Sequence, residues 1–202
     1  MSGSPGLLGA VLCSGLASLS AFAIAPPPMQ RCAGAVCLRE PHLTEDAFVE
    51  KFGTGAVLTD ADEPGRHQHC FFLGASSRWI LFTFERASTQ RTSELVSILI
   101  SSVELCSMRV LPKRSLGQAA TEGGIALGHQ RADIERVLGR PHRLDQVANK
   151  VAEGSSAAAN IDYSPRLGRT RLVYEIDNDT LFNFFYLSDC GELSSILLAD
   201  TP

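Results

Sequence analysis

The sequence predicts an α+β fold built from two tandem repeats, in each of which a short helical segment packs on an antiparallel β-sheet. Two observations lead to this prediction. Each half of the 202-residue chain has apolar residues at helical spacing, followed by runs rich in β-branched and aromatic residues. In addition, the run SELVSILIS at 93–101 returns as GELSSILLA at 191–199, with five identical positions. Such internal sequence similarity indicates the duplication of one folded unit.

The first 25 residues contain no charged side chain and end in small residues, which is typical of a secretory signal peptide. We therefore expect a periplasmic or secreted protein, with cleavage after Ala23 or Ala25. The apolar stretch 6–25 is also long enough to remain as a membrane anchor, and membrane contact is expected only in that case. Residues 26–42 are rich in proline and are interpreted as a linker or an irregular cap.

The first repeat is placed at residues 43–112 and is predicted to begin with a helix. Thr44 suits the N-cap position, because its hydroxyl can accept a hydrogen bond from a free amide of the first turn. Phe48 and Phe52 lie four residues apart and so share one helical face, and Gly53 is a natural end. The strands of this repeat are predicted at 69–74, 78–85 and 93–105.

A connection at 113–124 leads to the second repeat, placed at 125–202. Its helix is predicted from Ile134 and Leu138, which share one face, and it ends at Gly139. Its strands are predicted at 170–177, 180–187 and 192–199.

The charge balance does not indicate a surface that binds nucleic acid. The chain has 18 Lys and Arg residues against 22 Asp and Glu residues, for a formal net charge of −4. Arg166, Arg169 and Arg171 form the one tight basic cluster, which we interpret as a solvated loop in preference to a phosphate site. No nucleic-acid partner is therefore expected.

The six cysteines include Cys13 in the predicted signal peptide. Export to an oxidising compartment favours disulfides among the others, and Cys32 and Cys37 are close enough in sequence to close a short loop. Buried reduced thiols that pack as small apolar groups are the alternative. Because five cysteines remain after the signal peptide, at least one of them has no partner within the chain.

The most specific pattern is IALGHQRADIERVLGRPHR at 125–143, which resembles the helical signature of SmpA/OmlA-type domains. Such domains occur in BamE, a small lipoprotein subunit of the outer-membrane β-barrel assembly machinery. The residues that match the pattern are Leu127, Gly128, Ile134, Leu138, Gly139 and Pro141. Gln130 stands where that family has Thr or Ser.

Two such units in tandem resemble the β-lactamase-inhibitor protein fold, over residues 43–199. The resemblance implies a protein that binds other proteins and has no catalytic residues. No inhibitory contact residue is carried over from that family, because the loops contain no matching motif.

The strongest candidates for chemistry are His67, His69 and Cys70, which could act as soft metal ligands. A surface patch is the alternative interpretation, because no second ligand cluster accompanies them. The sequence contains no nucleophile elbow and no glycine-rich phosphate loop, so no cofactor is predicted. We expect a non-enzymatic module of the bacterial cell envelope that binds another protein through loops or an exposed sheet face, in particular 59–69 and 145–171. The alternative is a metal-binding protein or enzyme that uses the three candidates.

Overall fold

The structure is a computed structural model of the chain. It describes residues 30–41, 43–59, 65–86, 92–147, 166–176 and 180–200. The predicted signal peptide at 1–25 lies outside the described residues. Among the helices that are described, none is both long and apolar enough to cross a membrane.

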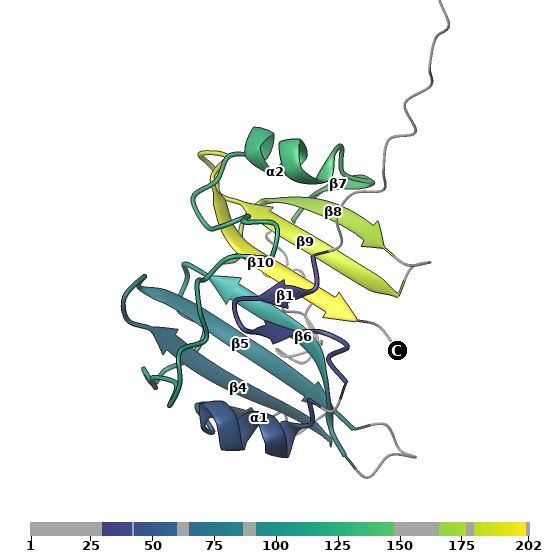
Figure 1. The fold of residues 1–202 in the computed structure, drawn as a ribbon. Helices are drawn as coiled ribbons and strands as arrows, with labels where there is room; N and C mark the ends of the chain where they lie inside the picture. Colours follow the sequence, from purple (N-terminus) through teal and green to yellow (C-terminus); the bar gives the residue numbers. More distant parts are fainter. Residues whose placement is uncertain are drawn as a thin grey trace, which may run out of the picture.

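One antiparallel sheet of eight strands forms the body of the molecule (Figure 1). The spatial order is β3-β4-β5-β6-β10-β9-β8-β7, so the first four and the last four strands each make up one half of the sheet. The first half consists of β3 (Ala56–Thr59), β4 (Arg66–Leu73), β5 (Arg78–Glu85) and β6 (Glu94–Ser101). The second half consists of β7 (Arg143–Gln146), β8 (Thr170–Ile176), β9 (Leu181–Leu187) and β10 (Leu193–Asp200).

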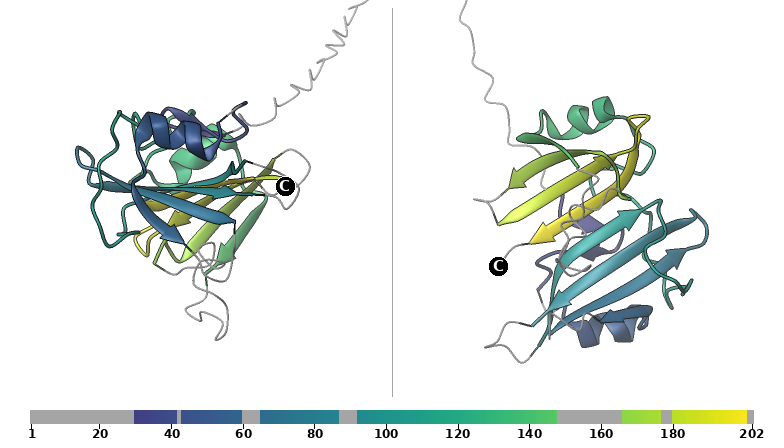
Figure 2. Two further views of the ribbon diagram at one scale, coloured as in Figure 1. Left: turned by 90° about the horizontal axis from the view of Figure 1, so that it is seen from below. Right: turned by 180° about the vertical axis from the view of Figure 1, so that it is seen from behind.

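Two short helices and a small hairpin lie on one face of this sheet (Figures 1 and 2). Helix α1 (Glu45–Phe52) lies over the first half and helix α2 (Arg131–Leu138) over the second. The hairpin pairs β1 (Cys32–Ala33) with β2 (Val36–Cys37) and lies between the two helices. Part of the segment predicted as a linker or cap thus contributes to the packed structure.

The predicted ends of α1 are confirmed. The Thr44 hydroxyl accepts a hydrogen bond from the amide of Ala47 at 3.3 Å, and Gly53 ends the helix with a φ of 91°. In α2, Gln130 takes the N-cap position, and its backbone amide donates to a carboxylate oxygen of Asp133 at 3.0 Å. Both helices therefore satisfy part of their first-turn hydrogen bonding through side chains.

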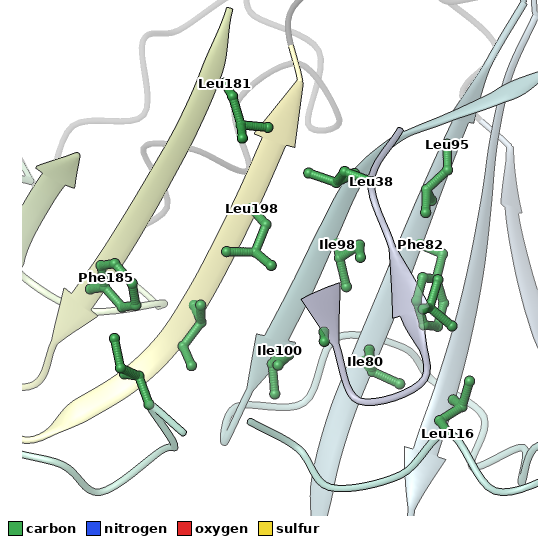
Figure 3. Close-up of a cluster of buried hydrophobic side chains, with 14 of the residues drawn as sticks. Leu38, Ile80, Phe82, Leu95, Ile98, Ile100, Leu116, Leu181, Phe185 and Leu198 are labelled. Atoms are coloured by element: carbon green, nitrogen blue, oxygen red, sulfur yellow. The ribbon is translucent and has the colours of Figure 1, made fainter. Parts of the chain in front are cut away.

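An apolar core fills the space between the sheet and the elements that lie on it (Figure 3). Alternate side chains of the strands point to this face, as the period of two in a β-strand requires. Against them pack side chains from the helices and the hairpin, all at most 3% exposed: Val36, Leu38, Phe48, Phe52, Ile134 and Leu138.

The opposite face of the sheet carries a second apolar core. Trp79, Leu99, Tyr186 and Leu197 are buried in it. Residues that follow β6 cover part of this face, and the disulfide between Cys70 on β4 and Cys106 ties them to it. The central strands are consequently buried on both sides, which explains why their sequences are nearly continuous apolar runs.

The two similar runs found in the sequence are the strands that join the halves. β6 pairs with β10 in antiparallel register, and Leu99 lies directly opposite Leu197. These two leucines occupy equivalent positions of the two similar runs. A local two-fold axis that passes between Leu99 and Leu197 therefore relates β6 to β10.

The predicted α+β class with two tandem helical repeats is wrong. The described chain is mostly β, with an eight-stranded sheet, a two-stranded sheet and only two helices of eight residues each. The direct pairing of β6 with β10 merges into one sheet what the sequence predicts as two. Local periodicity carries no information on pairing between strands so far apart in the chain. The sequence pattern also did not predict β3 and β7, since runs of four residues give almost no alternation signal.

The turn of the β1–β2 hairpin requires glycine. Gly34 has a φ of 59°, and a Cβ atom built there would collide with the backbone carbonyl oxygen of Leu116. The amide of Ala35 donates to this same carbonyl at 2.8 Å. The close approach of the two backbones docks the hairpin onto the segment that connects the halves.

We expect Gly34→Ala to lower the free energy of unfolding by about 3 kcal/mol, since overpacking adds to the left-handed backbone strain. Gly124→Ala is the matched control. Gly124 has a φ of 77°, but no atom lies within 4 Å of its added Cβ, so we expect a loss of only about 1 kcal/mol. Urea unfolding of both variants measures the difference. Equal losses would show that the Gly34 contact with Leu116 contributes nothing.

Candidate functional site

His67 and His69 lie side by side on the helix-facing side of β4 and both contact Glu45, the first residue of α1. One Glu45 oxygen lies 2.9 Å from His69 Nε2, and the other lies 2.9 Å from His67 Nδ1. The strand alternation places the two histidines on the same face. The N-terminus of the helix brings the carboxylate over them.

His69 is the buried member of this cluster, with 3% of its side chain exposed. Its ring packs against those of Phe48 and Phe84, with centroid distances of 5.9 and 5.7 Å. Its Nδ1 atom is 2.6 Å from the carbonyl oxygen of Thr54, while Nε2 faces Glu45. Carbonyl and carboxylate oxygens only accept hydrogen bonds, so both contacts are satisfied only when His69 carries both ring protons.

The pKa of Glu45 reflects two opposing effects. Burial of the carboxylate raises the pKa, because the charged form loses hydration. The hydrogen bonds and positive charges of His67 and His69 lower the pKa by more, so the net pKa lies below the ordinary value of 4.5. The ionised carboxylate is thus the form that the cluster stabilises.

Cys70 is not part of this cluster. It points to the opposite face of β4 and is bonded to Cys106, so its sulfur is not a free thiolate. The three candidate ligands His67, His69 and Cys70 are therefore not brought together. Glu45 takes the third place in the cluster. Within the described residues, no group of three His, Cys, Asp or Glu side chains has an arrangement that could hold a metal ion.

The pairing of Cys32 with Cys37, which the sequence leaves open, is present as a disulfide across the β1–β2 hairpin. Of the cysteines in the described residues, only Cys190 is free, and it is exposed. Its place is the turn between β9 and β10. The first disulfide cross-links the two strands of the hairpin, and the second ties the segment after β6 to β4.

The segment that connects the halves passes the turn between β4 and β5 (Figure 1). A groove lies between this segment and the turn. Its volume is about 640 Å³. One wall is formed by Phe72 to Ser76 and by Arg78, and the other by Leu111, Pro112 and the segment 115–120, with Ala126 and Leu127. Most of the lining side chains are apolar or small.

One of the groove's lining residues is a highly exposed leucine, and an exposed methionine precedes it in the chain. Leu111, which lines the groove, is 64% exposed, and Met108 is 60% exposed three residues earlier. They are the most exposed large apolar residues in the described part of the chain. Arg109, between them, places its guanidinium 4.7 Å from the ring centroid of Phe72, which also lines the groove. Exposed apolar surface in a concave region is typical of interaction sites.

The groove lies outside the regions that the sequence suggested for binding. Those regions, 59–69 and 145–171, fall partly outside the described residues, and their described parts do not line the groove. The groove residues give only a weak signal, because MRVLP at 108–112 has no period and reads as an ordinary connection. Only the fold places this run beside the β4–β5 turn.

The basic cluster at the start of β8 is not a free loop. Arg171 is buried, donates to Asp145 at 2.7 Å and lies 5.0 Å from the ring centroid of Phe184. Arg169 forms an ion pair with Asp189 at 3.2 Å. The interpretation of these residues as a solvated loop is therefore wrong for Arg171, because β8 carries it into the sheet.

No family model and no curated protein matches the chain. Among solved structures, the chain is similar to a DUF4309 family protein (YjgB) from Bacillus subtilis subsp. subtilis str. 168. The sequence identity is 12%, 78% of each chain is covered and the TM-score is 0.39. A similarity at this level establishes neither a shared fold nor a shared function.

The Glu45 cluster predicts an acid-sensitive contribution to stability. A carboxylate with a lowered pKa in the folded state stabilises the fold above its ordinary pKa, and this contribution disappears as the pH falls through the folded value. We expect Glu45→Gln to lower the free energy of unfolding at pH 7, and the gap to wild type to close below pH 4.5. Urea unfolding across this pH range measures the gap.

Glu50→Gln is the control for this experiment, since Glu50 is an exposed carboxylate on the same helix. We expect no pH-dependent gap for that variant. A Glu45→Gln gap that stays constant into acid would contradict the ionic role of Glu45.

Proposed function

We propose that this chain is an exported, non-enzymatic protein-binding module of the bacterial cell envelope, and that the groove beside the β4–β5 turn is its binding surface. The observation that carries the proposal is the exposed Leu111 in the lining of an apolar groove. Exposing such a side chain to water is unfavourable by itself, and a partner that covers it removes this cost.

The anatomy of the groove suits a protein partner. Interfaces typically combine an apolar centre with a polar rim, and Met and Arg are enriched in them. Here Ala119 and Leu127 supply apolar surface next to Leu111, and Arg109 lies on the ring of the lining residue Phe72. The walls are exposed turns that a second chain could approach freely.

Export is supported by two independent features. The uncharged, apolar residues 1–25 are typical of a signal peptide, and the disulfides Cys32–Cys37 and Cys70–Cys106 suit an oxidising compartment. The bacterial envelope is proposed from the resemblance of residues 125–143 to SmpA/OmlA-type domains. Retention of the leader would leave the module anchored to the membrane.

Photo-crosslinking in the producing cells tests the binding surface. We expect a benzoylphenylalanine at position 111 to capture one defined protein, which mass spectrometry identifies. With that partner purified, Leu111→Asp should weaken binding by about tenfold or more, because a charge would enter the apolar centre of the interface. Titration calorimetry measures the change.

Leu144 provides the matched control for crosslinking. It is an exposed leucine, 42% accessible, on the edge strand β7 at the far end of the sheet. A crosslinker there should not capture the same protein. The same products from both positions, or an affinity unchanged by Leu111→Asp, would overturn the proposal that the groove is the binding surface.

Thiol labelling tests the proposed compartment separately. We expect the chain isolated from its cells with immediate alkylation, and without reductant, to carry the label on Cys190 and not on Cys32, Cys37, Cys70 or Cys106. Peptide mass spectrometry locates the label. Efficient labelling of all four of those cysteines would place the chain in a reducing compartment and contradict export.

A further inference from the structure

The charged side chain in the lining of the groove is positive. Arg78 is the single charged side chain among its described lining residues. Arg109 lies on the ring of Phe72, and Arg114 is an exposed residue between the lining residues Pro112 and Ser115. Within the described part of the chain, none of these three arginines forms an ion pair.

Other arginines of the chain are neutralised by carboxylates. Arg66 pairs with Glu85, Arg143 with Asp145, and Arg131 with Glu135, at N–O distances of 2.6 to 3.0 Å. The formal net charge of the whole chain is −4. The groove is therefore a locally positive surface on a protein that is acidic overall, and this local field attracts negative groups.

We propose that the occupant of the groove is an acidic peptide segment of the partner protein, with apolar side chains interleaved among its carboxylates. This inference rests on the proposed function and names the chemistry of the partner. The apolar side chains of the segment fill the space between Phe72, Leu111 and Leu127. Its carboxylates pair with Arg78 and Arg109 at the rim.

The chemistry of the arginines supports this assignment. A guanidinium offers several donors in one plane and binds a carboxylate through two parallel hydrogen bonds. The contact with Phe72 holds Arg109 in place, which reduces the entropy that binding would cost. Apolar surface next to uncompensated cations selects for acidic partners and against basic ones.

The concave shape favours a peptide over a membrane. A bilayer surface would reach the exposed Leu111 but would leave the half-buried lining at Ala119 and Leu127 uncovered. A chain segment can enter the groove and cover both. Binding to vesicles of anionic lipid is therefore an outcome against the proposal.

Selection from a random peptide library, with the full chain as bait, tests the inference. We expect the selected peptides to be enriched in Asp and Glu interleaved with large apolar residues. A synthetic peptide of the consensus sequence should bind wild type more weakly at high salt than at low salt. The double substitution R78E/R109E should weaken binding by about a hundredfold, since it replaces attraction with repulsion at two contacts.

Arg140→Glu is the matched control, because Arg140 is an exposed arginine that follows α2 and does not line the groove. It should leave peptide affinity unchanged. Circular dichroism checks that R78E/R109E is folded, and the milder R78Q/R109Q variant, expected to lose about tenfold, replaces it if it is not.

Three outcomes would overturn the inference: selected peptides without acidic enrichment, an affinity that the arginine variants do not change, or wild-type binding to anionic vesicles that these variants abolish. The crosslinking at Leu111 separates this failure from failure of the proposed function. If crosslinking captures a partner but the selected peptides are neutral, the protein-binding function stands and the acidic chemistry of the partner is rejected. A partner that is captured equally at Leu144 would reject the surface itself.

Discussion

The rest of the structure depends on the antiparallel pairing of β6 with β10. It brings Leu99 opposite Leu197 and makes one continuous sheet from strands that belong to different halves of the chain. Four neighbouring side chains then face the helices: Ile98, Ile100, Ile196 and Leu198. Leu99 and Leu197 face the core on the opposite side of the sheet. The hydroxyl groups of Ser101 and Ser195 lie 2.8 Å apart across this junction and satisfy each other, so the pairing buries no unpaired hydroxyl there.

The groove follows from how the chain must leave this sheet. After β6 the chain covers the second core with Leu105, Cys106 and Val110, but the next helix lies over the first core. The connection therefore passes around the end of β4, where the amide of Phe72 donates to the carbonyl of Val110 at 2.8 Å. Leu111 comes immediately after this point and has no core to enter, so it stays exposed beside the β4–β5 turn. The proposed binding surface thus exists because the connecting segment crosses from one face of the sheet to the other.

The cluster of His67, His69 and Glu45 separates what local sequence patterns predict from what they do not. The spacing of His67 and His69 predicts that they share a face, and they do. The same alternation sends Cys70 to the other face, where it pairs with Cys106. Glu45 could not be predicted as their partner, since its contact depends on how α1 crosses β4. Thr44, Phe48 and Gly53, in contrast, act within a few residues of the helix and were predicted correctly.

The sequence by itself determined the features that arise from neighbouring residues: the ends of α1, the long apolar strands and the similarity between 93–101 and 191–199. Hydrogen bonding along a helix and alternation along a strand are local, so composition and spacing record them. Only the tertiary structure decided that one mainly β sheet forms in place of two repeats, that Glu45 meets His67 and His69, and that Leu111 borders a groove. These contacts join residues distant in the chain, and their free energy comes from burial and pairing that no short stretch of sequence contains.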